Sequence, residues 1–229
     1  MNARVPPDVL ALYAGAPARV RGHVRVRWRS CPFAAVAGRV PERGRILDYG
    51  CGHGAFAAWL AMLSPERAVE GVDVDAEKIA AAGGAARAAA AAGVPAPRFR
   101  RIARGEFPQE SWDAVLFVDV LYLLPPEEQE QLLRVAARSL APGGILLVKE
   151  VGARPRWKAL WNRVQETIAV RILRITQGGP LRILAPELHA AWLESEGLEV
   201  ESLSADRGYL HPHHLLAARR PSANRKEDA

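Results

Sequence analysis

Three alternate glycines and one aspartate mark the stretch from Arg45 to Phe56 as a candidate ligand site. It reads Arg-Ile-Leu-Asp-Tyr-Gly-Cys-Gly-His-Gly-Ala-Phe, an apolar run followed by Gly50, Gly52 and Gly54. The pattern predicts a strand, a tight turn and a helix start, because glycine permits a sharp turn and lets a ligand approach the main chain. The helix would offer its first N–H groups to that ligand.

Asp48 separates two interpretations of this turn, since it precedes the first glycine by two residues. Gly50, Gly52 and Ala55 also satisfy the dinucleotide pattern Gly-x-Gly-x-x-Ala. A pyrophosphate favours the positive N-terminus of a helix without a neighbouring carboxylate, whereas an ammonium or sulfonium group is attracted by one. The sequence therefore favours a ligand with a cationic end.

The turn resembles the first motif of the class I S-adenosylmethionine-dependent methyltransferases, hydrophobic-Leu-Asp-x-Gly-x-Gly-x-Gly. The resemblance covers roughly Arg45–Val151, and Pro186–Arg219 more loosely. It implies S-adenosylmethionine as the cofactor, with the acid at the end of the second strand binding the ribose. Many family members also carry an acid after the third strand, where this chain has an isoleucine and an alanine, so apolar and backbone contacts to adenine are expected. The implied cofactor-binding residues are Asp48, Gly50, Cys51, Gly52, Gly54, Asp73, Val74, Ile102, Ala103, Asp119 and Val120.

Two further stretches, Phe117–Tyr122 and Leu140–Gly144, resemble the fourth-strand and fifth-strand motifs of the family. The resemblance puts Asp119 where the methyl group is presented. It would either orient the substrate or cap the next segment. The chain lacks the Asn/Asp-Pro-Pro-Tyr/Phe tetrapeptide with which amino-methylating nucleic-acid enzymes bind a planar amine, which disfavours a nucleic-acid substrate.

Three histidines lie within four positions in the loop Asp206–His214. In the family this loop joins the last two strands, at the edge of the sheet where ligands bind. Histidine titrates near neutrality, so His213, and after it His211, are candidate general bases. In an extended segment these two share one face and His214 points to the other. Turn histidines without a catalytic role are the alternative, and no metal site is expected because no carboxylate partner is evident.

The elements that would position these residues alternate between strand and helix. Strands are expected at Ile46–Tyr49, Ala68–Val74, Arg98–Ala103, Trp112–Val118 and Ile145–Val151, and helices at Ala55–Leu63, Ala76–Ala92 and Pro125–Leu140. This alternation predicts an α/β fold with a doubly wound, mainly parallel sheet. The family implies seven strands with an antiparallel last strand, here drawn from Leu198–Leu203 and His214–Arg219 after a helix at Pro186–Glu196.

The alternation breaks at both ends of this core. Pro7–Tyr13 is predicted to be a short helix and Arg19–Val40 a helical or mixed lead-in, with Trp28, Phe33 and Val36 on its buried face. After the fifth strand, the apolar spacing in Arg154–Gln177 predicts an amphipathic helix. Gly152–Leu184 would form a lid or wall of an acceptor pocket, or would simply pack on the sheet. The candidate substrate-binding residues are Tyr122, Glu150, Trp157, Trp161, Gln165 and Tyr209.

The chain of 229 residues is long enough for one domain with embellishments. We expect a single methyltransferase domain over residues 1–220. Its parts are a lead-in (1–44), a cofactor-binding core (45–151), a helical lid insert (152–185) and the C-terminal part of the sheet (186–220), followed by a disordered tail at 221–229.

Composition and charge narrow the setting. Hydrophobic residues make up 49% and charged residues 24%, as in soluble globular proteins. Arginines concentrate in the lead-in and in the insert, and the net charge is +6. A basic surface suits an acidic substrate, an anionic membrane surface or a nucleic acid, although a solvated face is the plainer account. Two cysteines, no signal peptide and no run of membrane-spanning length indicate reduced thiols in the cytoplasm.

We therefore expect an S-adenosylmethionine-dependent methyltransferase that acts on a small molecule. The histidine-bearing loop favours O-methylation, because a hydroxyl acceptor must lose its proton as the new bond forms. A lipophilic or anionic acceptor, presented at a membrane surface or on a carrier, would fit a basic entrance. The alternatives are an RNA methyltransferase that uses the basic arms and a catalytically idle, cofactor-binding partner subunit.

Overall fold

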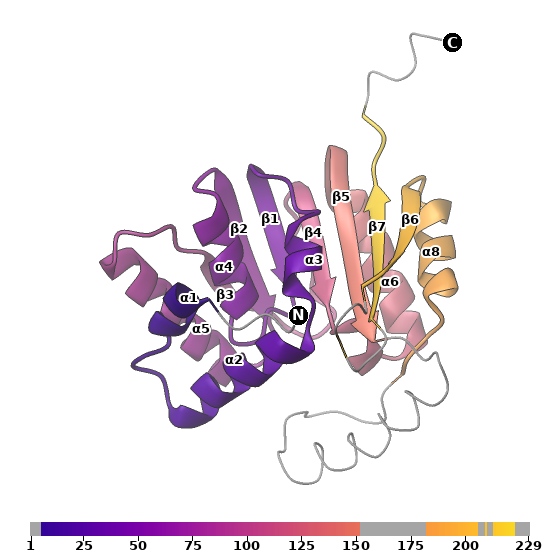
Figure 1. Cartoon of the computed structure of the whole chain (residues 1–229). Helices are drawn as coiled ribbons and strands as arrows, with labels where there is room; N and C mark the ends of the chain where they lie inside the picture. Colours follow the sequence, from indigo (N-terminus) through magenta and orange to yellow (C-terminus); the bar gives the residue numbers. More distant parts are fainter. Residues whose placement is uncertain (1–5, 152–181, 206–208, 210–212, 223–229) are drawn as a thin grey trace.

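The computed structural model describes residues 6–151, 182–205, 209 and 213–222. These residues form a seven-stranded sheet in the order β3-β2-β1-β4-β5-β7-β6, with helices on both faces (Figure 1). Strands β1 to β5 are parallel to one another, and β7 is antiparallel to both β5 and β6. The predicted α/β architecture, with its antiparallel last strand, is confirmed.

The strands are β1 (Gly44–Tyr49), β2 (Arg67–Asp73), β3 (Arg98–Arg101), β4 (Trp112–Val118), β5 (Leu140–Val151), β6 (Glu199–Ser204) and β7 (His213–Arg219). The helices are α1 (Pro7–Ala11), α2 (Ala18–Ser30), α3 (Phe33–Ala37), α4 (Ala55–Leu63), α5 (Ala76–Ala91), α6 (Pro126–Ser139) and α8 (Pro186–Ser195), with a single 3₁₀ turn, η1 (Leu121–Leu123). Among the described residues, no helix is both long and apolar enough to cross a membrane.

The structure reproduces the bounds predicted for α4 and β4 and differs at several other ends. β5 starts at Leu140 instead of Ile145, because Leu140 pairs with Trp112 across an irregularity in the β4–β5 register. The predicted turn at Pro142–Gly144 therefore lies inside the strand, with Gly143 at a φ of 77°. β3 ends at Arg101, two residues earlier than predicted. The helix predicted over Arg154–Gln177 lies outside the described residues, and the division of the chain into four parts stays a prediction.

Each face of the sheet packs against its own set of helices. Helices α1 to α5 cover one face, which receives Ile46 and Leu116, and α6 and α8 cover the other, which receives Leu47 and Val115. These strands are apolar on both faces, as expected of parallel strands buried between two helical layers.

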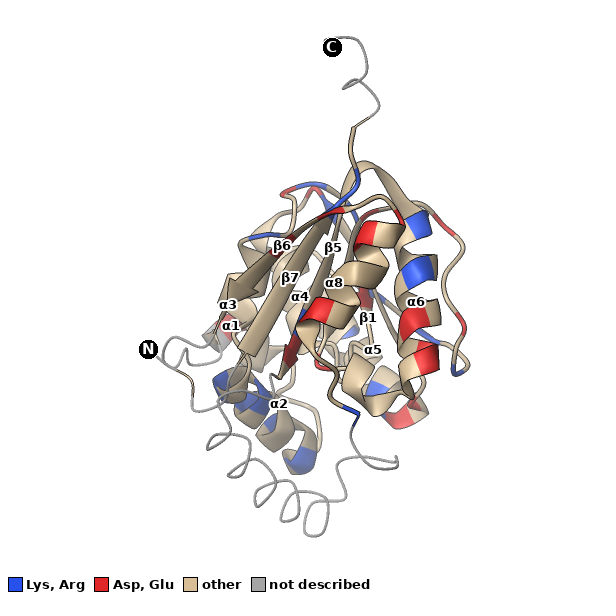
Figure 2. Cartoon of the chain, turned by 90° about the vertical axis from the view of Figure 1, so that its right-hand side faces the viewer, with Lys and Arg blue, Asp and Glu red and all other residues tan. Residues whose placement is uncertain are grey.

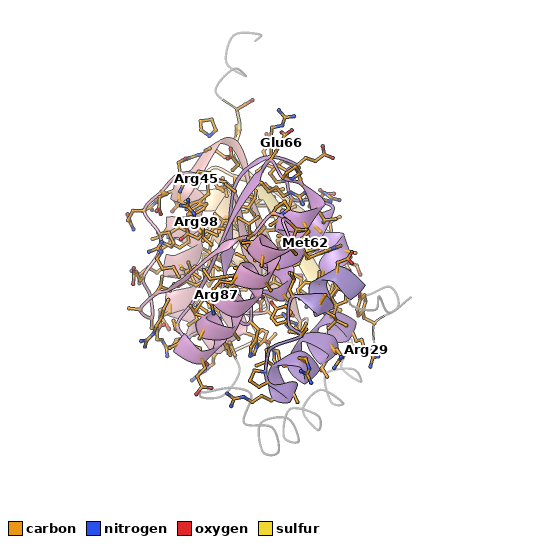
Figure 3. The ribbon with its side chains drawn as sticks, turned by 90° about the vertical axis from the view of Figure 1, so that its left-hand side faces the viewer. Arg29, Arg45, Met62, Glu66, Arg87 and Arg98 are labelled. Carbon is orange, nitrogen blue, oxygen red and sulfur yellow. The ribbon has the colours of Figure 1, made fainter. Side chains whose placement is uncertain are left out.

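The lead-in packs against α4 through aromatic rings. Trp28, Phe33 and Val36 are buried as predicted, at 3%, 6% and 0% exposure. The Phe33 ring stacks on Phe56 at 4.6 Å between centroids. This packing places α2 at the carboxyl ends of the parallel strands (Figure 1). Figure 3 shows Arg29 of α2 near that end and Arg45, the second residue of β1, near the opposite one.

Candidate active site

The glycine turn joins β1 to α4 with three residues in the left-handed region. The φ angles of Gly50, Gly52 and Gly54 are 76°, 57° and 77°. A side chain at any of them would be strained, because L-residues rarely adopt this conformation. The predicted strand, turn and helix start are therefore present, and Gly54 is the N-cap residue of α4.

The three glycines differ in what surrounds them. A Cβ on Gly50 would lie 2.5 Å from Cγ2 of Val120, and one on Gly54 would overlap the ring of Phe99. A Cβ on Gly52 would meet nothing within 4 Å among the described residues. Gly50 and Gly54 are thus constrained by packing, whereas the main chain at Gly52 faces open space where a ligand can approach.

Asp73 binds the turn from the end of β2. Its Oδ2 accepts a hydrogen bond from the Gly52 N–H at 2.9 Å, and its Oδ1 accepts one from the Asp75 N–H at 2.9 Å. Asp75 in turn caps α5, as predicted, by accepting from the N–H groups of Glu77 and Lys78. The acid that the resemblance assigns to the ribose therefore lies directly beside the open glycine.

Asp48 is a buried carboxylate on β1, with 3% of its surface exposed. No side-chain hydrogen bond joins it to another described residue, so its charge is unsatisfied by donors. Burial raises its pKa to about 7; Arg27 acts to lower that pKa and Asp73 to raise it. A buried carboxylate without donors is costly unless a cation meets it. An ammonium or sulfonium group would supply that cation, so the residues present fit a ligand with a cationic end.

The candidate adenine residues lie at the ends of β2 and β3. Val74 is 48% exposed although it is apolar, whereas Ile102 is buried and donates its N–H to the Asp73 carbonyl at 3.1 Å. The Ala103 N–H donates to Oε2 of Glu106 at 2.8 Å. Glu106 thus supplies a carboxylate after β3 that the sequence reasoning missed. The Ala-Arg-Gly-Glu turn was the available signal.

Cys51, the remaining predicted residue of the turn, is partly buried. Burial, followed by Asp48 and Asp73, raises the pKa of its thiol well above the ordinary value. The Cys51 thiol is therefore neutral, so Cys51 lines the site and does not act as a nucleophile.

Asp119 lies in an ion-paired cluster at the end of β4. Its side chain, 3% exposed, accepts from Nη1 of Arg27 at 2.6 Å and from Nζ of Lys149 at 2.7 and 2.6 Å. Burial alone would raise its pKa, but Lys149 and then Arg27 bring the pKa below the usual range. Such a carboxylate is a poor proton acceptor. Sequence reasoning missed both cations, because α2 and β5 meet here only through the fold.

Glu150 organises the loop that follows Asp119. Its carboxylate accepts from the N–H groups of Val120, Leu121 and Tyr122 at 3.1, 2.9 and 3.4 Å. Burial, and secondarily Asp119, raises its pKa to about 8, against the opposing effect of the Leu121 and Val120 N–H groups. Glu150 is therefore buried and positions the backbone of this loop. The same residue also lines a small pocket together with His189 and His214.

The remaining substrate-side residues gather around the C-terminus of α2. The Tyr209 hydroxyl donates to the Cys31 carbonyl at 3.4 Å, and its ring lies edge-on to His213 at 5.2 Å. Tyr122 is half-buried, and desolvation, together with Asp119, raises its pKa.

The two described histidines of the loop start β7. His213 is 2% exposed and lies opposite Val151, whereas His214 lies opposite Glu150. The neighbours Leu215 and Leu216 belong to opposite cores, so His213 faces the lead-in helices and His214 the α6 and α8 side. His211, Trp157, Trp161 and Gln165 lie outside the described residues, and their roles stay predictions.

The sheet order, the glycine turn after β1 and the acid after β2 define a Rossmann-like methyltransferase. The methyltransferase domain family matches residues 22–203, and the chain belongs to that family. This confirms the resemblance to the class I S-adenosylmethionine-dependent methyltransferases, whose cofactor is S-adenosylmethionine.

One curated relative matches part of the chain. It is an uncharacterized protein of Synechococcus sp. that is 32% identical over 151 residues, which are 63% of this chain and 34% of the relative. The chain therefore spans about a third of the length of that relative.

Solved structures share the fold at low identity. An O-methyltransferase family protein from Burkholderia thailandensis has a TM-score of 0.68 and 20% identity, over 93% of this chain and 62% of that one. Magnesium protoporphyrin IX methyltransferase from Synechocystis, with bound S-adenosylhomocysteine, has a TM-score of 0.65 and 18% identity, over 91% of both chains. The [4+2]-cyclase SpnF has a TM-score of 0.61 and 21% identity, over 83% of this chain and 80% of that one.

Proposed function

We propose that this chain binds S-adenosylmethionine at the glycine turn and transfers its methyl group to an oxygen of a small lipophilic or anionic acceptor. The observation that carries the proposal is the buried Asp48 carboxylate, which lacks a hydrogen-bond donor among the described residues, close to the open main chain at Gly52. Family membership supports the same cofactor.

The residues of the turn have distinct tasks in this proposal. Asp48 would accept hydrogen bonds from the cofactor's ammonium group, and Asp73 would accept them from its ribose hydroxyls. Exposed Val74 and buried Ile102 would offer apolar surface to the adenine. When bound, S-adenosylmethionine supplies a methyl group made electrophilic by a sulfonium centre.

The other side of the site would hold the acceptor. Alignment of the acceptor oxygen with the methyl group, in a space that excludes water, lowers the barrier without covalent help from the protein. Asp119 and Glu150 fix the loop between the two halves of the site. A hydroxyl acceptor would pass its proton to His213, which lies next to Tyr209 at the start of β7.

The outer face of α2 supports an anionic acceptor or an anionic surface that presents it. Arg25, Val26 and Arg29 are exposed on one side of this helix, and Val26 is 65% exposed. Figure 2 shows basic residues, all of them arginines, and no acidic residue on α2, whereas α6 carries both basic and acidic residues. This face lies at the carboxyl ends of the strands, where the proposed site opens.

Flotation with vesicles tests the surface-bound form of the proposal. Vesicles of anionic phospholipid should retain the protein at low salt, and vesicles of zwitterionic phospholipid should not. Each arginine contributes about 1 kcal/mol near such a surface, so Arg25→Gln with Arg29→Gln should weaken retention roughly 30-fold. The matched control changes the exposed Arg87 and Arg98 to glutamine. Equal loss in both double variants would contradict a docking role for α2.

Mass spectrometry of the purified protein tests the proposed function. We expect co-purified S-adenosylmethionine or S-adenosylhomocysteine, and transfer of an isotopically labelled methyl group to a small hydroxyl-bearing acceptor in a cell extract. Label on RNA, with binding that weakens steeply with salt, would favour the RNA methyltransferase. Cofactor binding without transfer to any acceptor would favour the idle partner subunit.

The proposed base has its own test, since His213 and His214 face opposite sides of the sheet. His213→Ala should lower turnover roughly 10²–10⁴-fold, the range for a lost general base. The pH–rate profile of this variant should also lose its acidic limb. Cofactor affinity should hardly change in this variant. His214→Ala serves as the control on the other face, and His211→Ala tests the second candidate. Near-normal turnover of the His211/His213 double variant would make these histidines turn residues.

A further inference from the structure

Arg27 extends from the lead-in helix α2 to the end of β4. Its Nη1 donates to Oδ2 of Asp119 at 2.6 Å, and its Nη2 donates to the Val118 carbonyl at 3.2 Å. The guanidinium also lies over the Phe33 ring, 5.5 Å from its centroid. Arg27 thus uses both ends of its planar fork on consecutive residues, which lysine cannot reproduce.

The residue that Arg27 holds has an unusual backbone. Asp119 has a φ of 57° and is the one non-glycine residue with positive φ in the described part of the chain. Such a conformation persists only where the surroundings impose it. Here Lys149 of β5 pairs with the carboxylate and accepts the Asp119 N–H at its own carbonyl, at 2.8 Å. Asp119 is therefore fixed by α2, β4 and β5 together.

The backbone of Asp119 sets the position of the next residue, Val120. The Val120 side chain lies so close to Gly50 that a Cβ there would meet its Cγ2 at 2.5 Å. The Val120 N–H donates to Glu150 at 3.1 Å. A chain of contacts consequently runs from Arg27 through Asp119 and Val120 to the first glycine of the turn.

Arg27 also acts on Asp48 through its charge. Burial of Asp48 favours the protonated acid, and Asp73 at the end of β2 favours it further. Arg27 from α2 is the nearby charge that favours the carboxylate, and Cys51 in the turn is held neutral by its surroundings. Without Arg27, a larger fraction of Asp48 would be protonated at neutral pH and unable to attract an ammonium group.

We propose that Arg27 is a positioning residue of the cofactor site, which holds Asp119 and Val120 against the glycine turn. The inference rests on the proposed function, because it assigns a role toward the same cofactor. It makes the lead-in helix α2 a working part of the site. Arg27 acts on the cofactor only through Asp119, Val120 and Asp48.

Calorimetric titration with S-adenosylhomocysteine, from about pH 5 to about pH 9, tests the proposal, since this interval brackets the titration of a buried aspartate. Affinity should rise with pH as Asp48 ionises. Arg27→Gln should bind at least roughly tenfold more weakly at neutral pH, as expected for a lost charged hydrogen bond, and its midpoint should move to higher pH. Arg27→Lys keeps the charge but not the fork, so its affinity should fall while its midpoint stays near that of the wild type.

The control is Arg87→Gln, which removes the same charge from an exposed position on α5. It should match the wild type in both affinity and midpoint. Circular dichroism and thermal unfolding verify the fold of each variant. Arg27→Gln leaves Lys149 paired with Asp119, and if it fails to fold, Arg27→Lys alone carries the test.

The outcomes separate the two claims. If the wild type binds, and Arg27→Gln and Arg27→Lys both match Arg87→Gln in affinity and in the pH of the midpoint, the role of Arg27 is overturned while the proposed function stands. If the folded wild type does not bind S-adenosylhomocysteine at any pH, the proposed function fails and this inference fails with it.

Discussion

Gly50 and Gly52 share a left-handed backbone but differ in surroundings, so alanine should affect them differently. At either position, the backbone strain should destabilise the fold by about 1–2 kcal/mol. At Gly50 the overlap with Val120 should add about 1–3 kcal/mol, whereas the Cβ at Gly52 enters open space. Urea unfolding of Gly50→Ala and Gly52→Ala measures this difference.

Cofactor binding by the same pair separates packing from function. Gly52→Ala should lose affinity for S-adenosylhomocysteine while its fold is nearly intact, because the new methyl group occupies the space that the ligand needs. A Gly52→Ala protein that binds normally would show that the ligand does not approach the main chain there.

Asp48 should weaken the fold in the absence of ligand. Burial raises its pKa from 3.8 to about 7, so the folded state holds a proton that the unfolded chain releases between those values. The wild type should therefore lose stability as the pH rises from about 4 to about 7, by up to roughly 4 kcal/mol. Asp48→Asn should remove this loss, becoming more stable than the wild type at about pH 8 and similar near pH 4.

Urea unfolding at both pH values, with S-adenosylhomocysteine titration of the same variant, measures the effect. We expect Asp48→Asn to gain stability and lose the ligand, as is common where a site is built from a destabilising group. A variant that is less stable than the wild type at the higher pH would indicate that Asp48 has a structural partner.

At the scale of elements, Gln129 joins α6, α8 and the chain that follows η1. It is fully buried, and its Nε2 donates to the carbonyls of Leu124 and Arg182 at 2.9 and 3.0 Å. Its Oε1 is 2.8 Å from Nε2 of His189, whose pKa burial lowers to about 4. His189 is thus neutral near pH 7 and donates this bond.

Removal of this side chain should cost stability. Gln129→Ala leaves the part-buried carbonyls of Leu124 and Arg182 and the buried imidazole of His189 without this partner, so the free energy of unfolding should fall by about 1–3 kcal/mol. Gln131→Ala is the matched control, because Gln131 is exposed on the same helix; it should change stability by less than about 0.5 kcal/mol. Equal effects of the two substitutions in urea unfolding would contradict a role for Gln129 in joining these elements.

Element order was predictable where local patterns decide it. The apolar run of β4 and the capped start of α5 are recognisable from their own residues. Because the carboxyl ends of parallel strands meet at one edge of the sheet, the proximity of Gly52 and Asp73 could also be predicted. The contact of Arg27 with Asp119 did not follow, because it depends on how α2 packs through Trp28 and Phe33. Without knowledge of this packing, an arginine on a helix is interpreted as a solvent-exposed residue.

The start of β5 shows a second limit of prediction from the sequence. Pro142, Gly143 and Gly144 predict a turn, and Gly143 does have a left-handed backbone. The pairing of Leu140 with Trp112 nevertheless extends the strand across the irregularity. Pairing with a neighbouring strand outweighs the local turn signal, and it cannot be read from one segment alone.

For the whole molecule, the fold narrows the reaction without fixing it. The solved structures that share it include methyltransferases and a [4+2]-cyclase, each near 20% identity. Sites grafted on a common fold determine the chemistry. The assignment of methyl transfer therefore rests on family membership and on the glycine turn with Asp48 and Asp73. The proposal for the acceptor rests on the residues of α2 and at the start of β7.

The central claim is that the glycine turn and Asp73 bind S-adenosylmethionine. Isothermal calorimetry with S-adenosylhomocysteine on the wild type and Asp73→Ala tests it most directly, with a nicotinamide dinucleotide as the competing ligand. We predict saturable binding by the wild type, weaker by about 1–3 kcal/mol in Asp73→Ala, and no binding of the dinucleotide. Preferential binding of the dinucleotide, or equal affinity of the two proteins for S-adenosylhomocysteine, would contradict the claim.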